Sequence, residues 1–110
     1  MTRTARIALP AVVLWAGLAM ATGAKPHPVA VTIEAFQFSP SELKVPRGTT
    51  VTFVNKDATP HTVTPKVPGS FQKTGRILSG ASKTVTFDKA GTFDYFCEIH
   101  TTMTGMVVVQ

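Results

Sequence analysis

Three side chains that bind metals lie close together near the C-terminus: Cys97, His100 and Met103. Cys97 is the only cysteine in the chain. A thiolate, an imidazole and a thioether at this spacing suit a soft, redox-active metal such as copper, and a second imidazole is available upstream at His61. Two histidines, one thiolate and one weak thioether make up a blue-copper electron-transfer site, which cycles between Cu(I) and Cu(II). The predicted metal ligands are therefore His61, Cys97, His100 and Met103.

The sequence leaves two points about these ligands open. Met106 competes with Met103 for the axial position, but Met106 begins an expected strand in phase with Val108, so packing is its better interpretation. The competing interpretation of Cys97 is a buried, inert thiol, because free cysteine is among the most buried residue types. Its histidine and methionine neighbours favour the metal site.

Short segments rich in strand formers surround these ligands, and turn residues separate them. No segment after the N-terminal stretch has a helical period. The stretch 65–82 is the least patterned, and we expect it to be a long connection. A β-sandwich or barrel is the predicted fold class. The expected strands are 29–36, 43–45, 50–55, 62–64, 83–87, 92–97 and 106–109.

The expected strands place the ligands at one end of the fold. Cys97 ends one strand and Gly105 precedes the next, so His100 and Met103 lie on the loop between two strands. His61 comes just before a strand, after a turn stiffened by Pro60. If the two segments belong to neighbouring strands, His61 reaches the same loop. The phenylalanines expected in the core are Phe36, Phe38, Phe53, Phe87, Phe93 and Phe96.

The first 24 residues have the three parts of a secretory signal peptide: a basic start, a short apolar run over 7–20 and small residues at the exit. We expect cleavage after Ala24, with Ala21 as the alternative site, and a mature domain over 25–110. An uncleaved anchor is the competing interpretation, although the run is shorter than the roughly 20 residues that a membrane-spanning helix needs. Export to the periplasm is the prediction, and an exported lone cysteine is explained by a metal.

The net charge of +5 is spread along the chain without a basic cluster. Nucleic-acid binding would need such a cluster, so it is not expected.

Two stretches resemble the cupredoxins, the type 1 blue copper proteins: NKDATPHTV at 55–63 and AGTFDYFCEIHTTM at 90–103. The stretch FQFSPSELKV at 36–45 is similar to their first strands. The two-residue gap between His100 and Met103 is that of the amicyanin-like members, whereas plastocyanin-like members place the methionine further along. The resemblance implies an eight-stranded Greek-key β-sandwich with one copper ion at one end. It implies copper ligation through His61, Cys97, His100 and Met103.

The chain departs from the family pattern at several positions. The family usually follows its first ligand histidine with an asparagine that braces the cysteine loop, and this chain has Thr62. The neighbours of His100 are Ile99 and Thr101, where amicyanins have prolines. The amine-dehydrogenase partner of amicyanins is therefore not carried over to this chain. The resemblance also gives Asn55 a bracing role near the site, while an ordinary turn residue is its other interpretation.

The expected function is a small, monomeric electron carrier that is not an enzyme. Its expected partners are redox proteins, such as a cytochrome, an oxidoreductase or an oxidase. The alternative is a periplasmic copper carrier or resistance protein with the same ligands. Carriers would be expected to have further methionine or histidine clusters, and only Met106 and His27 are available. A metal-free binding sandwich is the third hypothesis.

Overall fold

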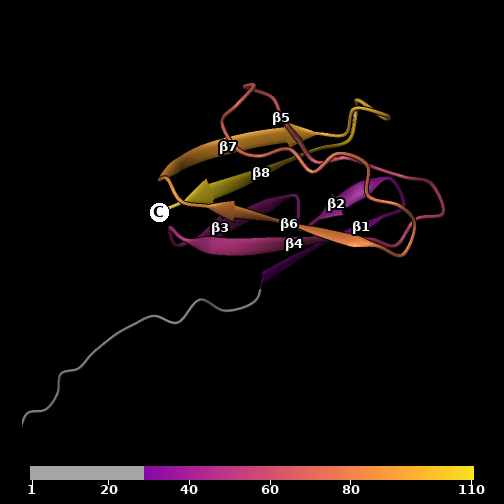
Figure 1. Cartoon of the computed structure of the whole chain (residues 1–110), viewed down its shortest axis with the longest axis horizontal. Helices are drawn as coiled ribbons and strands as arrows, with labels where there is room; N and C mark the ends of the chain where they lie inside the picture. Colours follow the sequence, from indigo (N-terminus) through magenta and orange to yellow (C-terminus); the bar gives the residue numbers. More distant parts are fainter. Residues whose placement is uncertain (1–28) are drawn as a thin grey trace, which may run out of the picture.

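The computed structural model describes residues 29–110, which form a sandwich of two four-stranded sheets (Figure 1). One sheet has the order β2-β1-β4-β6, and the other has the order β3-β8-β7-β5. The first comprises β1 (Val29–Glu34), β2 (Gln37–Ser39), β4 (Thr49–Asn55) and β6 (Ser82–Phe87). The second comprises β3 (Glu42–Val45), β5 (Thr64–Pro65), β7 (Gly91–Phe96) and β8 (Thr104–Val109).

The chain crosses repeatedly between the two sheets. β1 pairs in parallel with β4, and β3 pairs in parallel with β8, while the other pairs are antiparallel. Successive strands after β2 lie in opposite sheets until β7 and β8, which form a hairpin. The predicted all-β sandwich with eight strands is confirmed, and no helix occurs within residues 29–110.

The core follows the two-residue period of the strands, which turns alternate side chains inward. In β4 this period buries Val51, Phe53 and finally Asn55. In β7 it buries Tyr95, and the next residue on that face is Cys97. The same alternation that builds the core therefore delivers a buried amide and a buried thiol to one end of the sandwich.

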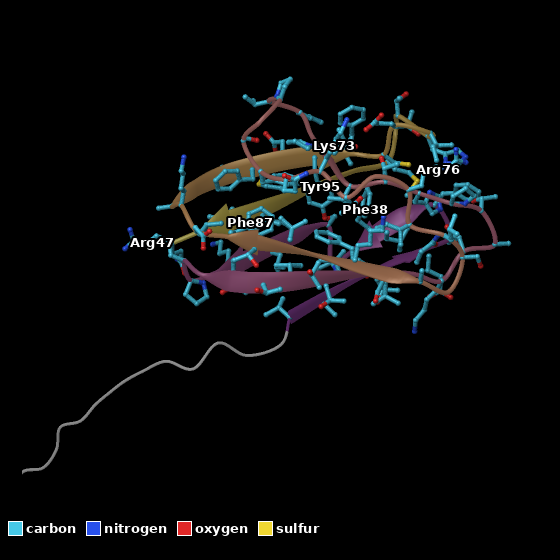
Figure 2. The ribbon with its side chains drawn as sticks, viewed as in Figure 1. Phe38, Arg47, Lys73, Arg76, Phe87 and Tyr95 are labelled. Carbon is cyan, nitrogen blue, oxygen red and sulfur yellow. The ribbon has the colours of Figure 1, made fainter. Side chains whose placement is uncertain are left out.

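Tyr95 lies at the centre of the core, between the two sheets (Figure 2). Its ring packs edge-on against Phe38 at 4.8 Å and Phe53 at 5.6 Å between centroids. Burial raises the pKa of the Tyr95 hydroxyl, so the side chain stays neutral. Edge-to-face packing of this kind adds to the stabilisation from burial alone.

Two strand predictions are corrected by the structure. The expected strand 29–36 ends at Glu34, because Ala35 and Phe36 form a two-residue turn with positive φ angles before β2. Neither residue is a glycine or asparagine, so the turn has no sequence signal. The expected strand 62–64 is shifted: β5 is Thr64–Pro65.

The phenylalanine prediction is right for part of the set. Phe38, Phe53 and Phe87 are buried, and Phe93 packs against the core while remaining partly exposed. Phe36 is 49% exposed because it lies at the turn, and Phe96 is half-buried on the outer side of β7. The prediction of a core position for Phe36 is wrong.

The segments that follow β4 and β7 lie at the same end of the sandwich, on the right in Figure 1. The β1–β2 turn lies at this end as well, because it contacts the segment after β4. The connection from β5 to β6 is long, as expected, and its Ile77 forms an isolated bridge with His61. The predicted meeting of the two ligand segments is thus confirmed.

The predicted signal peptide over 1–24 and His27 lie outside the described residues. Among the residues that are described, no helix is long and apolar enough to cross a membrane.

We predict that Gly105→Ala destabilises the domain. Gly105 lies opposite Tyr95 in the β7–β8 pair, and a Cβ there would overlap the Tyr95 ring and hydroxyl. Overpacking of a core by such a group costs about 1–3 kcal/mol in unfolding free energy, which urea unfolding of the metal-free protein measures. The cost should shrink when Tyr95→Leu is also present. A single variant as stable as the wild type would contradict the packing described.

Candidate metal centre

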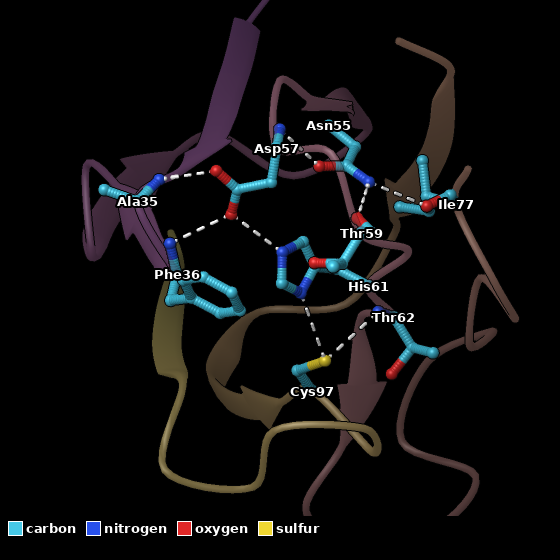
Figure 3. A network of polar contacts seen from close by, with 9 residues as sticks. All are labelled: Ala35, Phe36, Asn55, Asp57, Thr59, His61, Thr62, Ile77 and Cys97. Atoms are coloured by element: carbon cyan, nitrogen blue, oxygen red, sulfur yellow. Dashed lines mark hydrogen bonds and ion pairs between the residues drawn. The ribbon is translucent and has the colours of Figure 1, made fainter. Parts of the chain in front are cut away.

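Three of the four predicted ligands converge at the end of the sandwich. The ligand atoms of His61, Cys97 and His100 all lie within 4.8 Å of one another. His61 and Cys97 are fully buried, and His100 is partly exposed. Figure 3 shows the Nδ1 atom of His61 facing the Cys97 sulfur, 3.7 Å away.

His61 is held by backbone hydrogen bonds although it lies outside the regular strands. Its N–H donates to the Ile77 carbonyl at 3.1 Å, and the Ile77 N–H donates back at 2.7 Å. This pair ties His61 to the long connection between β5 and β6. The main chain of the first ligand is therefore fixed independently of the cysteine loop.

The loop after β7 closes on itself by two backbone hydrogen bonds. The Cys97 N–H donates to the Met103 carbonyl at 3.1 Å, and the Met103 N–H donates to the His100 carbonyl at 2.9 Å. Met103 is only 4% exposed, whereas Met106 is half-buried within β8 and lines a shallow surface hollow with Glu42. These placements favour Met103 over Met106 as the fourth ligand.

The chemistry of the donor atoms fits a soft metal ion. The Nδ1 atom of His100 is buried and has no hydrogen-bond partner among residues 29–110. A buried polar atom without a partner is costly, and a bound metal ion would satisfy it. Two imidazole nitrogens and a thiol sulfur around one point are the donors that copper prefers.

Thr62 braces the cysteine loop where the family usually has asparagine. Its N–H donates to the Cys97 sulfur at 3.4 Å, and its Oγ1 accepts the Glu98 N–H at 2.8 Å. Thr64 extends this network, since its Oγ1 donates to the Glu98 carboxylate at 2.7 Å and lies 3.0 Å from the Thr62 hydroxyl. Thr62 therefore supplies hydrogen bonds to the cysteine loop at the position where the family usually has asparagine.

Asn55 braces the segment that leads to His61. Its amide nitrogen donates to the carbonyls of Thr59 and Ile77 at 2.8 and 2.9 Å, and its amide oxygen accepts the Asp57 N–H at 2.9 Å. The side chain is fully buried. The bracing role fits this geometry better than that of an exposed turn residue.

Sequence reasoning missed Asp57, which contacts His61 on the side away from Cys97. The Asp57 carboxylate lies 2.8 Å from His61 Nε2, and it also accepts the backbone N–H groups of Ala35 and Phe36 at 2.7 and 2.9 Å (Figure 3). Burial raises the pKa of this carboxyl, but two backbone donors and the His61 ring outweigh burial and hold it below its usual range. The only hint of this contact in the sequence is that an acidic residue stands four positions before His61.

Phe36 is the second residue that was missed. Its ring lies edge-on to both histidine rings, with centroids 5.4 Å from His61 and 4.9 Å from His100. It therefore belongs to the rim of the metal centre. Two apolar residues accompany His100. Phe36 packs against its ring, and Ile99, which precedes it in the sequence, is 41% exposed.

Comparisons with known proteins agree with this arrangement. The family model described as a cupredoxin-like domain matches residues 6–109. The chain is 36% identical over 85 residues to amicyanin from Paracoccus denitrificans, covering 74% of this chain and 65% of that protein. It is 36% identical over 89 residues to plastocyanin from Scenedesmus fuscus, covering 69% of this chain and 89% of that protein.

A solved structure agrees as well. The Cu(I) structure of a methionine-to-alanine variant of amicyanin matches with a TM-score of 0.70 at 34% identity, covering 76% of this chain and 82% of that one. The chain spans about two thirds of the curated amicyanins from Paracoccus denitrificans and Paracoccus versutus, 65% and 64% of their lengths. The resemblance expected from the sequence is confirmed.

We predict that Thr62→Val lowers the unfolding free energy of the metal-free protein by about 1 kcal/mol, because the Glu98 N–H loses its acceptor. Thr62→Ser keeps the hydroxyl and serves as the matched control. Chemical unfolding followed by tyrosine fluorescence measures both. Equal stability of the valine and serine variants would show that the hydroxyl does not brace the loop.

Proposed function

The chain belongs to the family of cupredoxin-like domains, and from this we propose that it is a small blue copper protein that carries single electrons between redox partner proteins. His61 Nδ1, Cys97 Sγ and His100 Nδ1 would hold one copper ion, with Met103 as the weak fourth ligand. The observation that carries the proposal is the convergence of three donor atoms within 4.8 Å at one end of the sandwich.

The surroundings of the donors suit electron transfer. Bound copper would supply a one-electron couple, and the weak thioether would tune its potential. His61 and Cys97 are sealed from solvent, and His100 is the partly exposed member of the three. The edge of His100 is therefore where an electron would enter or leave, and the Cys97 thiolate would provide the strongest coupling into the domain.

Catalysis at this centre is disfavoured because protein side chains would fill all the coordination positions of the metal ion. Four protein ligands leave no position for a substrate, so the protein is proposed not to be an enzyme. The delivery of copper is disfavoured because a carrier would be expected to have further methionine or histidine clusters, and the sequence offers only Met106 and His27 beyond the four proposed ligands.

The location and assembly follow from the same proposal. Residues 1–24 act as a signal peptide that directs the domain over 25–110 to the periplasm. There the monomer meets its partners, which are a cytochrome, an oxidoreductase or an oxidase. Nucleic acid is not among them.

The thiolate of Cys97 should dominate the visible spectrum. We expect the wild-type protein with one equivalent of Cu(II) to show an intense absorption band from thiolate-to-copper charge transfer, and Cys97→Ser to abolish it. Visible absorption and electron paramagnetic resonance measure this, and Glu98→Gln at the next position is the control that keeps the band. An unchanged spectrum in Cys97→Ser would show that the site is assigned wrongly.

Met103 should influence the reduction potential of the bound copper but not the intense charge-transfer band. We expect Met103→Leu to retain the intense band and to raise the reduction potential, because the lost thioether favours Cu(II) over Cu(I). Protein-film voltammetry compares this variant with Met106→Leu, because Met106 belongs to β8 and lines a surface hollow with Glu42. A rise in Met106→Leu instead would assign the axial position to Met106.

A further inference from the structure

The turn between β1 and β2 has an unusual backbone. Ala35 and Phe36 have φ angles of 56° and 60°, in the left-handed region that glycine and asparagine favour. Both N–H groups of the turn donate to one carboxylate, that of Asp57, at 2.7 and 2.9 Å. Charge-assisted hydrogen bonds of this kind are strong, so Asp57 holds the turn in a conformation that its own residues disfavour.

The same carboxylate also orients His61. Oδ2 of Asp57 lies 2.8 Å from His61 Nε2 and also accepts the Phe36 N–H. An ionised carboxylate only accepts hydrogen bonds, so His61 must carry its proton on Nε2. The lone pair of Nδ1 then faces the Cys97 sulfur 3.7 Å away, where a metal ligand is needed.

The turn in its held conformation places an aromatic ring on the metal centre. Phe36 lies at interplanar angles of 90° and 80° to His61 and His100, so its ring stands across both imidazoles. Phe36 as a whole remains 49% exposed, so its position depends on the turn held by Asp57 more than on core packing. A single carboxylate thus connects a ligand histidine, a turn and the aromatic cover of both histidines.

We propose that Asp57 is a positioning residue of the metal centre, which fixes the tautomer and orientation of His61 and holds Phe36 across the two histidines. The effect on copper rests on the proposed function, whereas the effect on the His61 tautomer does not. A carboxylate on the remote nitrogen makes the imidazole a stronger donor and adds negative charge near the ion. Both effects favour Cu(II), so Asp57 lowers the reduction potential.

The test compares Asp57→Asn and Asp57→Ala with the wild-type protein in two states. In the metal-free protein, nitrogen-15 NMR in mildly alkaline buffer should show His61 protonated on Nε2 in the wild type, and a population protonated on Nδ1 in Asp57→Ala. In the copper-loaded protein, Asp57→Asn should keep the charge-transfer band, gain a higher potential and lose about 10- to 100-fold in Cu(II) affinity.

Two controls separate positioning from other effects. Glu98→Gln removes a negative charge next to Cys97 but touches no histidine, because the Glu98 carboxylate contacts Thr64. In Ala35→Gly, the glycine adopts the positive φ angle of the turn without steric cost, and Asp57 keeps its contact with His61. The reduction potential of this variant should therefore stay at the wild-type value. Asp57→Glu, which keeps the charge, should restore part of the potential and affinity.

Several outcomes would overturn the proposal. Because an asparagine amide oxygen can still accept the Nε2 proton, the decisive variant is Asp57→Ala, and the wild-type tautomer in Asp57→Ala would show that the carboxylate does not set the His61 proton. An equal rise in potential in Glu98→Gln would assign the effect to charge alone. If the wild type failed to form the charge-transfer band, the proposed function would fail, while the NMR experiment on the metal-free protein would still decide the role of Asp57.

Discussion

The metal centre depends on His61 being held from opposite sides. Asp57 lies at its Nε2 atom, Cys97 lies at its Nδ1 atom, and Ile77 pairs with its backbone. A fully buried imidazole would otherwise be free to turn or to exchange its proton between the two nitrogens. Since each contact comes from a different part of the chain, the ring can be correctly placed only after the sandwich has folded.

The cost of burying polar groups explains the hydrogen bonds that Asn55 and Thr62 make around the metal centre. Asn55 and Thr62 are both buried. Asn55 donates to the carbonyls of Thr59 and Ile77, and Thr62 is hydrogen-bonded to Cys97 and Glu98 in the cysteine loop. Such networks specify one arrangement only when their members are satisfied. The buried Nδ1 of His100 has no partner among the described residues, and it is the atom that the proposed copper would bind. A rigid set of donors suits a one-electron carrier, because little has to move when the charge of the ion changes.

The parts of this structure that local patterns encode could be predicted from the sequence. The alternation of β4 and β7 and the short spacing after Cys97 were enough to predict the fold and the meeting of His61, Cys97 and His100 at one end of it. Asp57 and Phe36 were not found, because their roles arise from contacts between β1–β2 and the segment after β4. The turn itself had no glycine or asparagine to reveal it. Thr62 was seen as a departure, and only the three-dimensional contact with Glu98 shows that a hydroxyl can brace the loop.

Contacts within the protein hold His61 and Cys97, so we expect the donor atoms to occupy the same positions with and without a bound metal ion. High-resolution crystal structures of the metal-free and the Cu(II)-loaded protein would test it most directly. We expect the same side-chain rotamers for His61 and Cys97 in both, with the contact between His61 and Asp57 retained and the ion bound to Nδ1 and Sγ. A rotation of the His61 ring away from Asp57, or a rearranged cysteine loop on loading, would contradict a preformed site.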